Sequence, residues 1–279
     1  MKVFICGLYR SGTTVTWRTL AQDERFTSFD EPFNENLADL PQLSHAGDNA
    51  CYLPRFRENP ALFRKIFIPI PPSRDLATDF TAQEEAYLRW LLTPYPAVNV
   101  DFTRCTFKLA ALRRLYPEAL IIHLKRAAPA FVSSHIITSH RAPGVRAALG
   151  RLYRRYTFFR RKGRYDFFNY EKIIEKHASA ELTYLLPQLK NPAPLSELPA
   201  YQKLLLLHRH NQNAVDAFAR THPENFTEWK FEEFAVRPEA HLRIIYEHFG
   251  VEMPVFDFSH LRAPNRGYRP DSPLWEEFG

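Results

Sequence analysis

The sequence predicts an α/β fold with a central, mostly parallel sheet and helices on both faces. An apolar run at residues 3–7 runs directly into a glycine-bounded turn and then a helical pattern. Further strand candidates, at 26–30, 104–109, 119–124 and 226–231, are separated by helical or mixed stretches. Strands that alternate with helices favour a parallel sheet covered on both faces.

The first strand and the turn after it are the most informative segment. Gly7 and Gly12 have the G-x-x-x-x-G spacing of a Walker phosphate-binding loop, and Thr14 stands at its Ser/Thr position. Loop N–H groups and the positive end of a helix bind anions. We therefore expect a P-loop-like three-layer sandwich with an anion site after the first strand.

The same loop lacks the Walker lysine. Thr13 stands in its place, and Arg10 is the one cation of the loop. A Walker lysine and Mg²⁺ together manage the charge of a nucleoside triphosphate, so this loop is poorly equipped for that work.

The run R-S-G-T-T after a first strand resembles the phosphosulfate-binding loop of sulfotransferases, which use adenosine 3′-phosphate 5′-phosphosulfate (PAPS) as sulfonyl donor. The resemblance implies that the donor is bound by Arg10, Ser11, Gly12, Thr13 and Thr14.

Two carboxylates end the second predicted strand. Sulfonyl transfer to a hydroxyl needs a group that takes the hydroxyl proton. Asp30-Glu31-Pro32 is similar to the Glu-Pro stretch of Golgi-type carbohydrate sulfotransferases and several bacterial relatives, in which the glutamate is the base. The resemblance implies Glu31 as catalytic base, because alternating strand side chains let only one of the pair face a given side. A pair of ordinary turn carboxylates is the alternative.

Lys108 ends the third predicted strand, 104–109, before a helix. Many sulfotransferases place a lysine there, close to the transferring sulfonate, and a cation at that place stabilises developing negative charge. The resemblance implies a catalytic role for Lys108. An exposed lysine at the end of a strand is the alternative.

The strand at 119–124 is followed by Arg126, and a helix is predicted to start near Pro129. This segment resembles the sulfotransferase pattern in which an arginine ends a strand, a serine lies eight residues further on, and both bind the 3′-phosphate of the donor. Arg126 and Ser134 match by type and spacing. Ala127 and Ala128 depart from the usual Arg-Asp-Pro turn.

The last third of the chain adds weaker matches. The segment around Phe231 resembles a family segment that carries a tyrosine there, and we expect Phe231 to pack in the core. Helices are expected at 201–220 and from Pro238 to a glycine cap at Gly250. The run RAPNRG is loosely similar to an Arg-Lys-Gly loop that caps the 3′-phosphate in some members. It makes candidate donor-binding residues of Arg266 and Gly267.

Length and composition predict one domain over residues 1–279, with insertions near 35–100 and 140–225. Three dispersed cysteines show neither metal spacing nor a disulfide pattern, which favours a reducing, cytoplasmic setting. The predicted strand starts at residue 3, so we expect no signal peptide. The apolar runs are too short to span a bilayer. No metal is required, and the oligomeric state is left open.

A net charge of +6 suggests an anionic partner. Residues 141–165 hold no acidic side chain and alternate basic residues with aromatics. This segment has three interpretations: a solvated helix face, a site for an acidic sugar acceptor, or contact with membrane headgroups or nucleic acid. No nucleic-acid-binding motif is present, so we expect no nucleic-acid partner.

Taken together, the sequence predicts a PAPS-dependent sulfotransferase that modifies an acceptor hydroxyl, on a carbohydrate or another small molecule, and releases adenosine 3′,5′-bisphosphate (PAP). Two alternatives stay open. The first is a P-loop nucleotide kinase or NTPase, against which the missing lysine counts. The second is a non-enzymatic binder of nucleotides and polyanions, which steep salt dependence without turnover would favour.

Overall fold

A computed structural model describes residues 1–42, 51–136, 174, 176 and 178–261 of the chain. The chain divides into two compact units, which we describe separately. The first unit runs to Lys125 and resumes at Val215, and the second begins at Arg126 and ends at Ala214.

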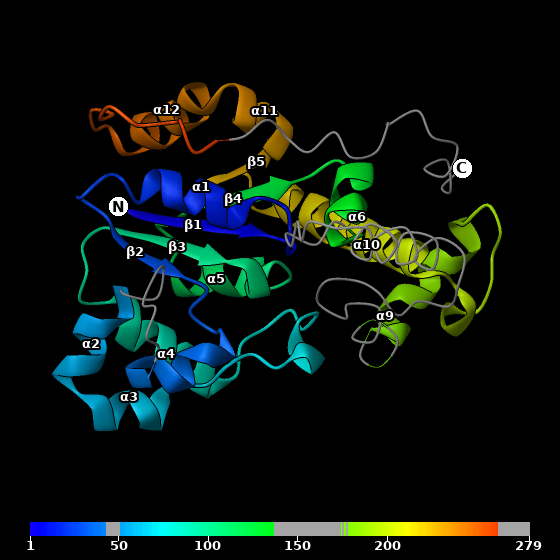
Figure 1. The fold of residues 1–279 in the computed structure, drawn as a ribbon, viewed down its shortest axis with the longest axis horizontal. Helices are drawn as coiled ribbons and strands as arrows, with labels where there is room; N and C mark the ends of the chain where they lie inside the picture. The colour runs from blue at the N-terminus through cyan, green and yellow to red at the C-terminus, as the bar shows by residue number, and fades with distance from the viewer. Residues whose placement is uncertain (43–50, 137–173, 175, 177, 262–279) are drawn as a thin grey trace, which may run out of the picture. The chain divides into compact units, whose positions relative to one another are not determined.

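The first unit is built on a five-stranded sheet in the order β2-β3-β1-β4-β5 (Figure 1). Each neighbouring pair of strands is parallel. The predicted α/β fold with a parallel sheet is therefore confirmed. The strands are β1 (Lys2–Gly7), β2 (Thr27–Asp30), β3 (Val98–Phe102), β4 (Leu120–Lys125) and β5 (Phe226–Lys230).

The strand predicted at 104–109 is wrong, because β3 lies at Val98–Phe102 instead. The Asp101 carboxylate explains where β3 ends. Its Oδ1 accepts hydrogen bonds from the Thr103 backbone N–H (3.1 Å) and hydroxyl (2.7 Å), and these close a turn directly after the strand. Lys108 consequently stands immediately before a helix and outside any strand.

The order of the strands creates a switch point beside β1. The chain passes from β1 to β2 and β3 on one side, and only then to β4 and β5 on the other. In open α/β sheets, ligands bind outside the carboxyl ends of the strands where the order reverses. The turns after β1 and β3 lie at that place, because Ile5 pairs with Asp101 and Cys6 with Phe102.

Side chains of β1 alternate between two cores. Val3 and Ile5 pack with Trp17 on one face, while Phe4 and Cys6 belong to the core on the other. Full burial of such a side chain stabilises the fold by about 1.5–3 kcal/mol. Figure 1 shows the helices that cover each face. The first face carries α1 (Thr13–Leu20), α11 (Phe231–Val236) and α12 (Pro238–Phe249), and the second carries α4 (Ala82–Leu92) and α5 (Leu109–Leu115).

Two predicted helices are confirmed. The 201–220 prediction corresponds to α10 (Ala200–Thr221), and α12 ends at Gly250, whose φ of 63° is a left-handed cap. Glycine adopts this conformation without the steric cost of a Cβ.

Short helices make up most of the remaining described structure. In the first unit these are η1 (Glu35–Gln42), α2 (Leu53–Glu58), α3 (Pro60–Ile66), η3 (Pro72–Arg74) and η4 (Thr103–Cys105). The second unit holds α6 (Ala128–Ile136), α9 (Ser179–Leu182), η5 (Thr183–Gln188) and η6 (Leu195–Glu197). Within the described residues, no helix has the length and apolar character needed to cross a bilayer.

Candidate active site

Gly12 shapes the loop between β1 and α1. Its φ of 98° and the φ of 70° at Arg10 are both left-handed, so the chain turns sharply here. A Cβ on Gly12 would come within 2.2 Å of the Phe231 ring. Phe231, the first residue of α11, is buried as predicted and packs against the loop. The loop needs glycine for its backbone conformation and for this contact.

The loop meets the two requirements of an anion site. The first N–H groups of α1, beginning at Thr13, have no acceptor within the helix, and the helix end is positive. Arg10 is exposed on the same loop. Gly7 brings the start of the loop close to β4, since a Cβ there would lie 2.9 Å from the Leu124 carbonyl oxygen.

The two threonine hydroxyls bond to the turn after β3. Thr13 Oγ1 lies 3.0 Å from Thr103 Oγ1, and Thr14 Oγ1 donates to Asp101 Oδ2 at 3.2 Å. Asp101 is fully buried, and its burial, with the nearby charges of Asp30 and Glu31, raises its pKa well above the ordinary value. A carboxyl that is harder to ionise binds Mg²⁺ less strongly.

Glu31 follows β2 directly and has a left-handed φ of 46°. Its N–H donates to the Asp101 carbonyl (3.1 Å), and Asn34 Nδ2 donates to its Oε2 (2.8 Å). Burial raises the pKa of Glu31, while the Asn34 hydrogen bond and the charge of Arg104 oppose that shift. A carboxylate with a raised pKa is a better proton acceptor near neutral pH.

Arg104, which sequence reasoning missed, connects three segments. Its Nη1 donates to the Ile70 carbonyl (2.9 Å), its Nη2 pairs with Glu35, and its guanidinium lies 5.7 Å from the Tyr9 ring centre. Its side chain is only 11% exposed. A position directly after β3 would have indicated a place at the carboxyl edge of the sheet. The strand predicted at 104–109 instead put Arg104 at the start of a strand.

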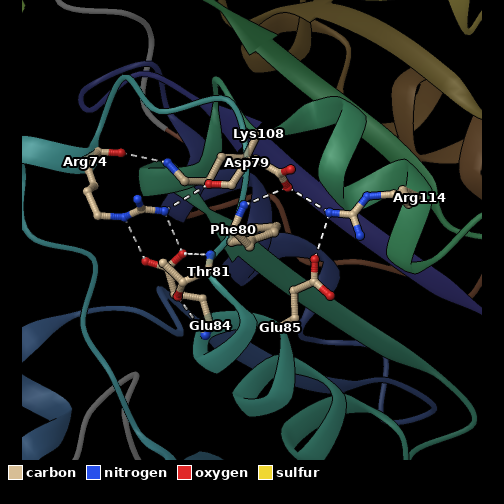
Figure 2. Close-up of polar contacts among 8 residues, drawn as sticks. All are labelled: Arg74, Asp79, Phe80, Thr81, Glu84, Glu85, Lys108 and Arg114. Carbon is tan, nitrogen blue, oxygen red and sulfur yellow. Dashed lines mark hydrogen bonds and ion pairs between the residues drawn. The ribbon is translucent and has the colours of Figure 1, made fainter.

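Lys108 is fully buried, so the alternative of an exposed lysine is wrong. Its Nζ donates to the Arg74 carbonyl at 2.8 Å, as Figure 2 shows. Burial lowers its pKa. One of its three N–H groups therefore holds the segment around η3, and a role beside the sulfonate stays a prediction.

Polar contacts attach the segment between η3 and α4 to the helices α4 and α5 (Figure 2). Arg74 pairs at 3.0 Å with Glu84, which is 1% exposed and also closes the capping box of α4 with Thr81. Arg114 of α5 bonds to Asp79 and Glu85 at 2.7 Å each.

The second unit holds the predicted 3′-phosphate residues. Arg126 follows β4 directly and is half-buried, and its carbonyl accepts a hydrogen bond from His208 Nε2 (2.8 Å). Ser134 lies in α6, buried, with its hydroxyl donating to the Phe131 carbonyl at 2.6 Å. Ser134 can donate to a phosphate only if that hydroxyl turns away from Phe131.

Several other predictions concern residues away from this loop. Arg266, Gly267 and the basic segment 141–165 lie outside the described residues. His123 of β4 is a core histidine, 1% exposed, with its Nε2 3.3 Å from Thr106 Oγ1. Across the described parts of the chain, no group of His, Cys, Asp or Glu side chains could hold a metal ion.

The parallel sheet, with a glycine-bounded and lysine-free loop after β1 at its switch point, places the protein in the P-loop-like α/β class. The sequence profile of the sulfotransferase family matches residues 2–178, which include β1 to β4 and the residues discussed above. The chain belongs to the sulfotransferase family, and its reaction is sulfonyl transfer to a hydroxyl-bearing acceptor. A search of curated proteins found no significant match.

Proposed function

We propose that the protein transfers the sulfonyl group of PAPS to a hydroxyl of a carbohydrate-like acceptor and releases PAP. The observation that carries this proposal is the loop from Arg10 to Thr14. In this loop Arg10 and Gly12 have left-handed backbone angles, and the first N–H groups of α1 have no acceptor within the helix. Arg10 supplies a cation, and no Walker lysine is present. In the sheet, β3 alone separates β1, which precedes the loop, from β2, which precedes Glu31.

The donor would be recognised by its negative groups. Arg10 and the N–H groups up to Thr14 suit the 5′-phosphosulfate. Arg126 suits the 3′-phosphate, because a planar guanidinium donates two parallel hydrogen bonds to phosphate oxygens. Ser134, and more weakly Arg266 and Gly267, are the further candidates at that phosphate.

In the proposed reaction, the acceptor oxygen attacks sulfur as the bond from sulfur to the bridging phosphate oxygen breaks. Glu31 takes the acceptor proton, and the electron pair of the broken bond leaves with PAP. Arg10 and Lys108 stabilise the negative charge on the leaving oxygen. Lys108 has two N–H groups beyond the one that bonds to Arg74.

One observation supports the kinase alternative. Thr14 and Asp101 form the hydroxyl–carboxylate pair that nucleotide triphosphatases use around Mg²⁺. Two features oppose this alternative: Thr13 replaces the lysine, and burial raises the pKa of Asp101, which weakens this carboxyl as a Mg²⁺ ligand. ATP with Mg²⁺ therefore belongs in the binding experiments as a competitor of PAP.

The experiment that tests the proposal follows radioactive sulfur from PAPS into a panel of monosaccharide glycosides. Glu31→Gln should reduce turnover about 10²–10⁴-fold, because the base is lost, while PAP binding persists. Glu239→Gln, a change at an exposed carboxylate of α12, is the control and should stay within a few-fold of wild type. Near-normal turnover in Glu31→Gln would remove Glu31 from the reaction.

A further inference from the structure

Asp75 is a buried carboxyl for which the proposed reaction gives no role. It follows η3 directly and is 8% exposed. Its Oδ1 is buried, and no group in the described part of the chain hydrogen-bonds to that oxygen. A buried acceptor that has lost water without gaining a partner is unfavourable, so its presence calls for an explanation.

The surroundings of Asp75 place it beside the proposed base. Burial, Glu35 and Glu31 raise its pKa to about 6, and the cations Arg104 and Lys108 oppose that shift. Hydrogen bonds bring the segment of Asp75 close to that of Glu31. Ile70 N–H donates to the Phe33 carbonyl, and Arg104 bonds to both the Ile70 carbonyl and Glu35.

Arg104 offers a donor in the same region. Its Nε is buried and, among the described residues, has no hydrogen-bond acceptor. The Nε atoms of Arg55 and Arg113 are also buried without an acceptor among the described residues. An unpaired arginine Nε alone therefore does not mark a site, and Asp75 is the stronger observation. The hydroxyls of Tyr87 and Tyr116 also lack partners, but both belong to the apolar core.

The backbone around Asp75 is held in place by hydrogen bonds. Ile70 N–H donates to the Phe33 carbonyl (3.3 Å), Arg104 donates to the Ile70 carbonyl (2.9 Å), and Lys108 donates to the Arg74 carbonyl (2.8 Å). The backbone beside Asp75 is therefore held in place, which favours a preorganised position for its unused oxygen.

We propose that Asp75 and Arg104 bind a second hydroxyl of the acceptor, next to the hydroxyl that receives the sulfonyl group. A hydroxyl both donates and accepts, so it can donate to Asp75 Oδ1 and accept from Arg104 Nε. This inference rests on the proposed function, with Glu31 as base. It assigns the acceptor to neutral polyols with neighbouring hydroxyls, because an acidic acceptor would bring its charge toward Glu31, Glu35 and Asp75.

The test compares pairs of methyl glycosides with and without the hydroxyl next to the labelled one, using PAPS with radioactive sulfur. Wild type should prefer the intact sugar by about 10²-fold, because a site built to bond a hydroxyl discriminates strongly against its absence. Asp75→Asn should reduce this preference to within about threefold. Asp79→Asn, a nearby exposed carboxylate, is the control and should keep it.

Thermal unfolding separates a binding role from a structural one. Asp75→Asn should raise Tm near neutral pH, because it removes a charge whose burial the nearby cations Arg104 and Lys108 offset only in part. A lower Tm, or a variant that does not fold, would show a structural role and overturn the proposal.

The transfer assay has contradicting outcomes of its own. Equal transfer to monohydric alcohols, an unchanged preference in Asp75→Asn, or no labelled polyol despite tight PAP binding would each overturn this inference alone. Loss of PAP binding in wild type would instead reject the proposed function.

Discussion

At Gly12, a backbone requirement and a packing requirement coincide. Gly12→Ala must adopt a φ of 98° and also displace the Phe231 ring, whereas Gly250→Ala meets only the strain of a φ of 63°, with open space around it. We expect a loss of about 1–2 kcal/mol for Gly250→Ala and a further loss of about 1–3 kcal/mol for Gly12→Ala. Urea unfolding of both variants measures this difference, and equal losses would contradict the packing argument.

Asp75 predicts a pH dependence of stability. Its pKa rises from 3.8 in the unfolded chain to about 6 in the folded protein, so the folded state binds the proton more tightly. Below about pH 4 this group therefore contributes about 3 kcal/mol to the free energy of unfolding, and that contribution is lost as the pH rises to about 6.

Asp75→Asn removes this dependence. The free energy of unfolding of wild type should fall relative to the variant between about pH 4 and pH 6, and stay constant relative to it above that range. Other titrating groups, such as Asp101, are common to both proteins and largely cancel. Parallel pH dependences would contradict the raised pKa.

Residue types and spacing were enough to predict the strand, the glycine turn at Arg10 to Thr14 and the helix after it, whereas Glu31 was named from a family resemblance and its role stays a prediction. Arg104 and Asp75 could not be predicted in the same way. Their surroundings form only because segments far apart in sequence come into contact around Tyr9 and Ile70, and the sequence near each residue does not indicate that contact.

At the scale of elements, Figure 2 shows the ion pair of Arg74 with Glu84 and the contacts of Arg114, which differ in their exposure to solvent. Arg74→Ala leaves Glu84, which is 1% exposed, without its cation, and should cost about 1–3 kcal/mol. Arg114→Ala removes contacts with the more exposed Asp79 and Glu85 and should cost about 0–1 kcal/mol. Chemical unfolding gives both values, and a larger loss for Arg114→Ala would show that burial does not decide the contribution.

The elements themselves were predicted unevenly. Four strands and the helices α10 and α12 were recovered because their apolar patterns are strong. β3 was missed because Asn99 and Asp101 interrupt its apolar residues, although both are fully buried in the structure. Their burial depends on tertiary hydrogen bonds, such as that from Thr14 to Asp101, which the strand sequence alone does not indicate.

At the scale of the whole molecule, the proposed function assigns the 3′-phosphate of the donor to Arg126. Arg126→Ala should weaken PAP binding by about 2–5 kcal/mol, because it removes the charge partner of a phosphate. Lys125→Ala, which loses only a 3.7 Å contact with Glu228, is the matched control. Calorimetry measures both affinities, and an unchanged PAP affinity in Arg126→Ala would exclude this arginine from the site.

The most direct measurement is a calorimetric titration of the wild-type protein with PAP, beside ADP and ATP with and without Mg²⁺. We predict tight PAP binding that does not require a metal ion, and much weaker binding of ADP, because the 3′-phosphate is recognised. Equal affinity for PAP and ADP, or binding of ATP only with Mg²⁺, would contradict the proposed PAPS site and favour a nucleotide kinase or NTPase.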